Sequence, residues 1–297
     1  KSGAAITKTL LIYIPCHSDF KMALKNADRV RVQYRKFGQN SIYPNLAIQI
    51  VISVNGVELS RIEKDDLERV ADQLLVYSAH LGADININQG FVKALEVEPD
   101  YFWILSANEI LVESAIGNLF TKILSNPFSD VFITNSMDRT STFETDNFFL
   151  DLPPGLGTGL ISSVVYNFGT MQQAFSAGPR FGWTGWGQLA VIEFGCRSKG
   201  TLVVTEMPDS EIYLKPFTFL EDKPKSKEFE VVRKNYAHSY FGMVVLISIL
   251  YAREQSKRNR ILKLWLAQNW YKLRYFKKGI DISFKSRDPQ FDSLWVQ

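Results

Sequence analysis

The sequence predicts an α/β protein whose central sheet is mainly parallel, is flanked by helices and is followed by a helical C-terminal appendage. The first observation is a set of short apolar runs, Leu10–Ile14, Ala47–Val54 and Tyr101–Leu105, which have the length and composition of buried strands. The second is that stretches with helical spacing separate these runs. Strand and helix in alternation are typical of a parallel sheet with helices on its faces.

The composition narrows the class of protein. The 297 residues can bury a full core, and 46% hydrophobic with 22% charged residues is usual for a soluble globular protein. The two cysteines, Cys16 and Cys196, are too few for a disulfide framework, which favours a reducing cytoplasm. Lys1–Thr9 shows no signal peptide, and no apolar run reaches the roughly 20 residues that span a bilayer. The sequence therefore predicts a cytoplasmic protein that does not cross a membrane.

The elements of the first half follow one another regularly. A helix is expected at about Phe20–Phe37, because Gly38 is a usual residue just past a helix C-terminus. The second strand ends at the turn Asn55-Gly56. Ser60–Tyr77 is expected to be one helix, because its apolar residues recur at helical spacing: Leu67, Val70, Ala71, Leu74 and Leu75.

The stretch that follows, Gly82–Val112, is the centre of the functional prediction. It reads as a turn, a helix that starts at Asn88 and Gly90, and the apolar strand Tyr101–Leu105. Directly after that strand comes the polar cluster Ser106-Ala107-Asn108-Glu109. In open α/β sheets ligands bind at the carboxyl ends of the strands, so we expect the chemistry there.

The second half has a weaker pattern. Met137–Asp151 shows no clear period, and Gly178–Gly187 reads as a glycine- and tryptophan-rich loop. From about Phe229 the chain changes character and is expected to be helical, which predicts domains at 1–228 and 229–297. The other expected elements are helices near Ser114–Leu124, Phe168–Ala177 and Gln188–Cys196, and strands at Val131–Asn135, Leu160–Tyr166 and Thr201–Glu206.

The order of these features resembles that of GT-A glycosyltransferases, in particular the large bacterial group that assembles polysaccharides. The resemblance runs from about Leu10 to Thr205 and rests on four motifs: Ile14-Pro15-Cys16-His17, Asn55-Gly56, Asn88-Gln89-Gly90 and the loop Gly182–Leu189. It implies a Rossmann-like GT-A fold and transfer of a sugar from a nucleotide-sugar to a glycan, with a lipid-linked glycan as one candidate acceptor. It also implies a donor site formed by Pro15, Cys16, His17, Asn55, Gly56, Asn88, Gly90, Ser106 and Asn108.

The metal-binding motif departs from that family. Where the family carries Asp-x-Asp, which binds a divalent metal on the donor diphosphate, this chain reads Ser106-Ala107-Asn108 and then Glu109. Mg²⁺ and Mn²⁺ favour charged oxygens, and Glu109 is the single carboxylate of the cluster. Either Glu109 holds the metal with Asn108 and the diphosphate, or the enzyme uses no metal and neutralises the diphosphate with cations. His238 stands where many of these enzymes supply a late histidine, so the resemblance implies Glu109 and His238 as metal ligands.

The catalytic base departs from the pattern too. An inverting enzyme needs a carboxylate to take the proton of the acceptor hydroxyl, and the matching position holds Gln188, whose amide cannot do so. Carboxylates lie on both sides of it in the sequence, so inverting or retaining transfer stays open; they are Glu144, Asp146, Asp151 and Glu193. The catalytic candidates are Glu109, Gln188 and Asp151, and Trp183 and Trp186 are expected to stack on an acceptor sugar.

The C-terminal segment carries a separate signal. Between Arg253 and Lys278 nine Lys or Arg stand against one acid, Glu254; the basic residues are 253, 257, 258, 260, 263, 272, 274, 277 and 278. Aromatic and aliphatic residues are interleaved with them, which suits the surface of an anionic bilayer. The segment has no RNA-binding signature, so we expect a peripheral position on the inner face of a membrane and no nucleic acid partner.

Two other functions compete with sugar transfer. A catalytically inactive GT-A-like protein that binds glycans or partners would also lack Asp-x-Asp. A nucleotidyltransferase of related sheet topology is less favoured, because the first strand is not followed by the glycine-rich, lysine-containing loop of such enzymes.

Overall fold

The computed structural model of the chain divides into two compact units. The larger comprises Lys1–Trp183 and Gly187–Phe217, and the smaller comprises Thr184–Trp186 and Thr218–Gln297. The structure describes residues 7–16, 20–39, 46–79, 82–107, 109–135, 140–152, 161–214 and 242–267.

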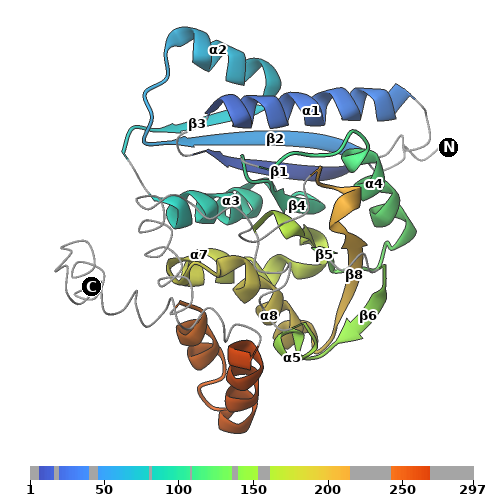
Figure 1. The fold of residues 1–297 in the computed structure, drawn as a ribbon, viewed down its shortest axis with the longest axis vertical. Coiled ribbons are helices and arrows are strands. Elements are labelled where there is room, and N and C mark those ends of the chain that lie inside the picture. Colours follow the sequence, from blue (N-terminus) through green and yellow to red (C-terminus); the bar gives the residue numbers. More distant parts are fainter. Residues whose placement is uncertain are drawn as a thin grey trace. The chain divides into compact units, whose positions relative to one another are not determined.

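The larger unit is built on one eight-stranded sheet, with the strand order β3-β2-β1-β4-β7-β5-β8-β6 (Figure 1). The strands β3, β2, β1 and β4 are parallel, β7 is antiparallel to β4 and β5, β8 is parallel to β5, and β6 is antiparallel to β8. Their bounds are β1 Lys8–Cys16, β2 Leu46–Asn55, β3 Gln73–Tyr77, β4 Tyr101–Ile104, β5 Val131–Asn135, β6 Thr142–Thr145, β7 Val164–Asn167 and β8 Leu202–Pro208. The three strands predicted first are therefore parallel neighbours, with β1 between β2 and β4.

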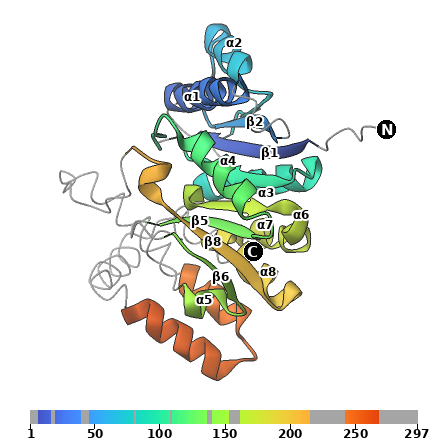
Figure 2. The ribbon, with the colours of Figure 1, turned by 90° about the vertical axis from the view of Figure 1, so that its right-hand side faces the viewer.

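Helices cover both faces of this sheet (Figure 2). On one face α1, α2 and α4 share a core with Leu10, Ile12 and Ile14 of β1. On the other face, Phe91 of α3 and Phe102 of β4 form an aromatic cluster with Tyr166 and Phe175. The ring centroids in this cluster are 5.5 to 6.0 Å apart. The helices of this unit are α1 Phe20–Gln39, α2 Arg61–Val70, α3 Ala83–Val97, α4 Ala115–Ser125, α5 Phe148–Asp151, α6 Phe168–Met171, α7 Ala177–Phe181 and α8 Gly187–Lys199. Because both faces are covered, the whole run Leu10–Ile14 is buried, as a continuous apolar strand requires.

The prediction of a single helix at Ser60–Tyr77 was wrong in its second half. α2 begins with a capping box of Ser60 and Glu63 and ends at Val70, after which the chain forms β3 along β2. Asp72 explains the change: its backbone N–H donates to Ile50 O (2.8 Å), and its carboxylate accepts from Ile50 N (2.7 Å) and pairs with Arg31. Helical spacing of the leucines therefore continued by chance into an edge strand.

The second half also differs from its prediction. The polar stretch before residue 152 contains β6 and α5, and the expected glycine-rich loop contains α7 and the 3-10 turn Gly182–Thr184. The strand expected at Leu160–Tyr166 is the 3-10 turn Ile161–Ser163 followed by β7. The helix expected at Phe168–Ala177 is instead α6 followed by the 3-10 turn Gln172–Ala174. These elements span only three to five residues, too few for a periodic pattern to emerge.

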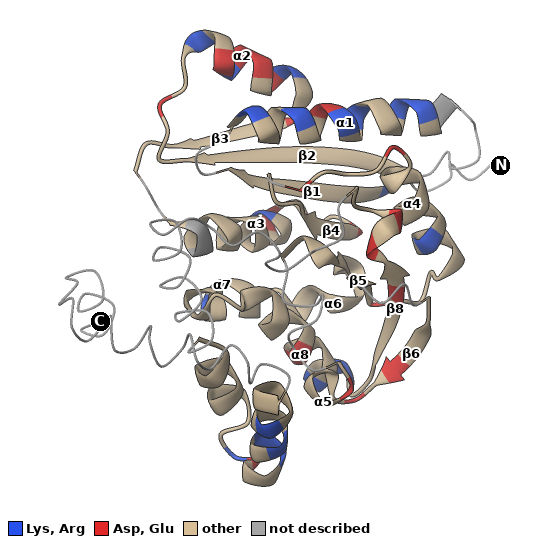
Figure 3. Cartoon of the chain, viewed as in Figure 1, with Lys and Arg blue, Asp and Glu red and all other residues tan. Residues whose placement is uncertain are grey.

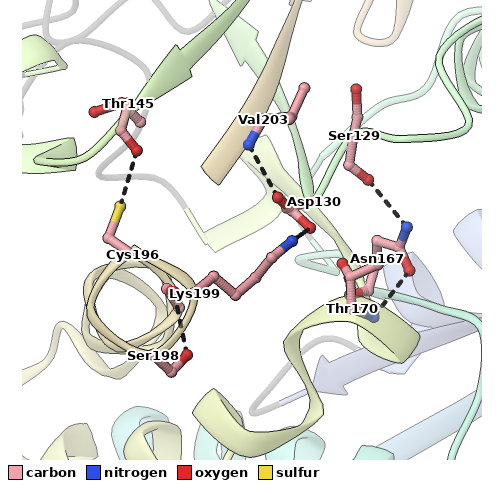
Figure 4. Close-up of polar contacts among 10 residues, drawn as sticks. Ser129, Asp130, Thr145, Asn167, Thr170, Cys196, Ser198, Lys199 and Val203 are labelled. Atoms are coloured by element: carbon pink, nitrogen blue, oxygen red, sulfur yellow. Dashed lines mark hydrogen bonds and ion pairs between the residues drawn. The ribbon is translucent and has the colours of Figure 1, made fainter. Parts of the chain in front are cut away.

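A polar network ties α8 to the amino ends of β5 and β8 (Figure 4). The Asp130 carboxylate is buried, accepts from Val203 N (2.9 Å) and pairs with Lys199, the last residue of α8. The Asn167 amide donates to Ser129 O (3.0 Å) on the same edge. A buried carboxylate needs such partners, so this edge of the sheet is fixed by structural charges, opposite the edge where the parallel strands end.

The smaller unit contains helices at 242–250 and 255–267. Seven apolar residues of this part of the chain are buried, namely Met243, Leu246, Ile247, Leu250, Tyr251, Ile261 and Trp265, whereas Ile249 is 45% exposed. A Cβ on Gly242 would lie 1.9 Å from the carbonyl oxygen of Thr184, so glycine is required for this contact inside the unit. The expected helical character is found at 242–267, whereas the domain boundary at 228 lies outside the described residues and stays a prediction. In the parts of the chain that the structure describes, no helix is both long and apolar enough to cross a membrane.

Candidate functional site

The carboxyl ends of the central parallel strands meet at one edge of the sheet. Cys16 at the end of β1 pairs with Val54 of β2, and Leu105 N, just past β4, donates to Tyr13 O (2.9 Å). The structure thus brings Pro15, Cys16, Asn55 and Ser106 to one edge. This is the position at which α/β sheets bind ligands.

Asn86 of α3 joins the strand ends to one another. Its Oδ1 accepts from Ser53 Oγ (2.5 Å) and Tyr13 Oη (3.2 Å), and its Nδ2 donates to Cys16 O (3.2 Å) and Ser53 O (3.3 Å). The Tyr13 hydroxyl also donates to Asn86 O (3.0 Å), and burial raises the pKa of this tyrosine well above its ordinary value. One buried amide therefore sets the relative position of β1, β2 and α3. The sequence analysis missed it, although a polar residue in register with the buried Gly90 and Ala94 was a visible signal.

α3 starts earlier than predicted, so Asn88 and Gly90 lie inside the helix rather than at its start. The helix begins after Gly82, which has φ 79° and whose carbonyl accepts from Asn55 Nδ2 (3.1 Å). A Cβ on Gly90 would lie 2.8 Å from the Tyr13 ring, so this glycine allows the close approach of α3 to β1. Asn55 therefore holds the start of α3, and Gly90 allows α3 to pack closely on β1. Gly56, by contrast, is exposed with φ 71°.

Asn88 contacts the glycines around α7 and α8. A Cβ on Gly182 would lie 1.6 Å from Asn88 Nδ2, and one on Gly187 would lie 3.1 Å from Asn88 Oδ1. The glycines of the predicted loop are therefore required by close packing on α3. The structure places Asn88 against this segment, and Asn86 holds the strand ends.

The turn after β4 is held from two sides. Ser106 N donates to Ser162 Oγ (2.9 Å), and Glu109 N donates to Ser106 O (3.2 Å). From α1, Asn26 Nδ2 donates to Ala107 O (2.9 Å) and Glu109 O (2.7 Å). The backbone that carries Glu109 is therefore fixed by side chains distant in sequence.

Glu109 has the most distinctive electrostatics of the predicted residues. Its carboxyl is half-buried, and burial raises its pKa from 4.5 to about 7. Burial raises the pKa of Tyr213, whose hydroxyl donates to Ser162 O (2.5 Å), and the nearby Glu109 carboxylate raises it further. A carboxyl that titrates near neutral pH can hold or accept a proton under physiological conditions.

The described residues at this edge do not fit a protein-built metal site. Glu109 is the one carboxylate of the turn, and its raised pKa means that it is only partly ionised at neutral pH. No three His, Cys, Asp or Glu side chains in the described ranges come together as a metal cluster. Divalent metals favour several charged oxygens, so a metal here would need oxygens from the donor as further ligands.

The other acid–base candidates are spread out along the chain. Gln188 is buried in α8, and its backbone carbonyl oxygen accepts a hydrogen bond from Tyr166 Oη (3.0 Å). Asp151 is exposed and accepts from Thr145 Oγ1 (2.6 Å). Glu193 is buried and pairs with Arg197 one helical turn later (3.1 Å). Glu144 and Asp146 are exposed.

The predicted acceptor residues fall in different units. Trp183 belongs to the larger unit and is 53% exposed, whereas Trp186 belongs to the smaller unit, is half-buried and donates from its backbone N to Thr184 Oγ1 (3.2 Å). An exposed tryptophan offers a face for stacking on a sugar. His17, Asn108 and His238 lie outside the described residues, so their predicted roles stay predictions.

Comparison with known proteins identifies the fold. No protein-family model and no curated protein sequence matches the chain. Mannosyltransferase PcManGT from Pyrobaculum calidifontis, in complex with GDP-Man and Mn²⁺, is 11% identical with a TM-score of 0.50, over 96% of this chain and 78% of that chain. S. aureus TarS 1-349, in complex with UDP, is 10% identical with a TM-score of 0.50, over 89% of this chain and 72% of that chain. Likeness at this identity concerns the fold: the chain has the GT-A fold that its sequence predicted.

Proposed function

We propose that this chain is a glycosyltransferase that moves a sugar from a nucleotide-sugar donor to a glycan, with lipid-linked glycans among the acceptors to be tested. The observation that carries the proposal is Glu109, a carboxyl with a pKa of about 7 at the carboxyl end of β4 in a GT-A sheet. Two solved structures of similar fold hold GDP-Man with Mn²⁺ and UDP, which supports a nucleotide-bearing donor.

In this proposal the residues of the edge divide the work. The nucleotide lies across the ends of β1 and β2, whose relative position Asn86 fixes. The diphosphate and sugar lie beside the turn Ser106–Glu109, where Glu109 accepts a hydrogen bond or a proton from the reacting sugars. A divalent cation, where the donor brings one, would neutralise the leaving diphosphate. Donor oxygens would then supply most of its ligands, because the turn offers a single carboxylate.

The competing function is a GT-A-like protein that binds a nucleotide-sugar without turning it over. Its supporting observation is the single carboxylate of the Ser106–Glu109 turn. A binding protein would be stabilised by donor but would leave it intact, so donor cleavage separates the two functions.

Donor binding is expected to stabilise the protein against heat. A ligand present at 100 times its Kd adds about 2.7 kcal/mol to the free energy of unfolding, which shifts the Tm by several degrees. We would screen UDP- and GDP-sugars by thermal shift, each with Mn²⁺ and with EDTA, and then measure release of free nucleotide from every hit. No shift with any donor contradicts the proposal. A shift without nucleotide release in the presence of acceptor favours the binding protein.

We further propose that the smaller unit contacts an anionic membrane surface by charge. Between residues 242 and 267 seven apolar side chains are buried, but Ile249 is 45% exposed and Leu262, Leu264 and Leu266 are half-buried. Arg253, Arg260 and Lys263 are exposed. Figure 3 shows the Lys and Arg of this part of the chain in blue. The described residues of this unit therefore expose basic charge, together with the apolar side chain of Ile249. The remaining basic residues of the segment, 272, 274, 277 and 278, lie outside the described residues.

Reversing three of these charges is expected to release the protein from anionic vesicles. Each basic residue near such a surface contributes about 1 kcal/mol, so Arg253→Glu, Arg260→Glu and Lys263→Glu together should weaken binding by a hundredfold or more, about 3 kcal/mol. The matched control reverses Arg61, Lys64 and Arg69, three exposed basic residues of α2. Sedimentation with phosphatidylserine and phosphatidylcholine vesicles is the measurement. Equal binding of parent protein to both lipids, or equal loss in both triple variants, contradicts the proposal.

A further inference from the structure

α1 carries two amide side chains in its otherwise apolar buried stripe. Asn26 is 1% and Gln33 is 8% exposed, and they lie among Ala23, Ala27 and Val30. The two amides are seven residues apart, two helical turns, so they lie on the same side of the helix. Both reach the segment that follows β4, but they hold different parts of it.

Asn26 gathers the carbonyls of the turn. Its Nδ2 lies 3.4 Å from Ser106 O, 2.9 Å from Ala107 O and 2.7 Å from Glu109 O. Its Oδ1 is buried and has no hydrogen-bond partner among the described residues. The direction of the amide is therefore determined, because exchanging the two ends would place Oδ1 against three carbonyl oxygens. One side chain thus holds three backbone carbonyls near Glu109, those of residues 106, 107 and 109.

Gln33 holds the chain beyond that turn. Its Nε2 donates to Val112 O (2.7 Å), and its Oε1 accepts from Ile116 N (3.0 Å) in the first turn of α4. Gln33 therefore fixes the start of α4, three or more residues after Glu109. It offers a matched control: a buried amide on the same face of the same helix, whose hydrogen bonds go to Val112 and Ile116.

We propose that Asn26 is the positioning residue of Glu109: by binding the carbonyls of residues 106, 107 and 109, it sets where the Glu109 carboxyl stands against the donor. The inference rests on the proposed sugar transfer. The hydrogen bonds that Asn26 makes to the segment after β4 all end on backbone oxygens, so it acts on Glu109 through the backbone. Among the described residues Tyr213 is a titratable neighbour of Glu109, and Asp209 lies near Tyr213 in turn; the Asn26 amide adds no charge to this group.

The expected signature is a loss in turnover that depends on Glu109. Misplacing a reacting group by about 1 Å can cost a hundredfold in rate, so Asn26→Ala should lower kcat by about ten- to a hundredfold while donor KM changes by less than about threefold. Gln33→Ala should lose similar stability in urea but keep kcat within about threefold. In a Glu109→Gln background, Asn26→Ala should change kcat by less than about twofold, because the group that it positions is gone. Asn26→Ser, which retains one donor, serves if Asn26→Ala does not fold.

Two results would overturn the proposal. One is an equal loss of kcat in Asn26→Ala and Gln33→Ala, and the other is a loss in Asn26→Ala that persists unchanged in the Glu109→Gln background. A titration of the Glu109 carboxyl by carbon NMR needs no turnover and separates this proposal from the proposed function. Asn26→Ala should move that pKa toward the ordinary value of about 4.3, and Gln33→Ala should leave it in place. An unchanged pKa in Asn26→Ala rejects the positioning role, and absence of turnover in the parent protein rejects the transferase alone.

Discussion

Glu109→Gln is expected to reduce sugar transfer by about a hundredfold or more, since loss of a charged contact that defines the reaction site costs about 2–4 kcal/mol. Glutamine keeps the shape of the side chain but can neither carry charge nor accept a proton. The measurement is kcat with saturating donor at neutral pH. Glu113→Gln is the control, because Glu113 is exposed four residues later. Turnover within about threefold of the parent would remove Glu109 from the mechanism and turn attention to Asp151 or Glu193.

The same substitution is expected to stabilise the protein at high pH. Burial raises the pKa of Glu109 from 4.5 to about 7, so the folded state binds its proton more tightly than the unfolded state does. Its contribution to stability is therefore fully present below pH 4.5 and is lost as the pH rises through 7. Glu109→Gln should match the Tm of the parent at about pH 4 and exceed it at about pH 8. A Tm difference that does not change with pH would contradict the buried-carboxyl assignment.

Asn86→Ala is expected to have the largest effect on stability, about 3 kcal/mol or more, because a buried polar group without a partner costs about 1–3 kcal/mol. The substitution removes the partners of Ser53 Oγ, Cys16 O and Ser53 O at once. Urea unfolding gives the free-energy change, and calorimetry on the folded fraction should show weaker donor binding, because the ends of β1 and β2 are no longer fixed.

Asn118→Ala is the comparison for this experiment. Asn118 of α4 is half-buried and donates to Glu211 O (2.8 Å) and Ser114 Oγ (3.1 Å), neither of which belongs to a strand. It should lose about 1 kcal/mol and leave donor affinity unchanged. Stability losses of equal size in the two variants would show that Asn86 is an ordinary buried amide rather than the residue that joins the strand ends.

The fold could be predicted where buried strands are long enough to read. A short, wholly apolar run such as Leu10–Ile14 indicates a strand that is covered on both faces. Runs of this kind predicted β1, β2 and β4. The edge strand β3 could not be recognised, because its leucines match helical spacing and its pairing depends on Asp72, a contact set by β2. Elements of three to five residues, such as β6 and α7, are decided by neighbours distant in sequence.

The sequence could predict which residues gather at the strand ends, and their role as a site stays a prediction. The edge formed by Cys16, Asn55 and Ser106 follows from the strand ends, and Glu109 stood out as the single carboxylate there. Asn26 and Asn86 were missed because their roles come from carbonyls of other elements, which no local pattern reveals. In the sequence, each of them is an amide residue within the apolar stripe of a helix. A buried amide is costly unless it makes hydrogen bonds, so such a residue could have been noted as a candidate.

The contact between Gly242 and Thr184 has a consequence for the order in which the chain folds as it is made. Synthesis proceeds at about 5–20 residues per second, so Thr184 leaves the ribosome seconds before the glycine against which it packs. The eight strands of the sheet all precede residue 209, so the sheet can close first. The segment that carries Trp186 must wait for the helices at 242–267. A nascent chain can thus complete its sheet while the packing around this tryptophan is still unmade.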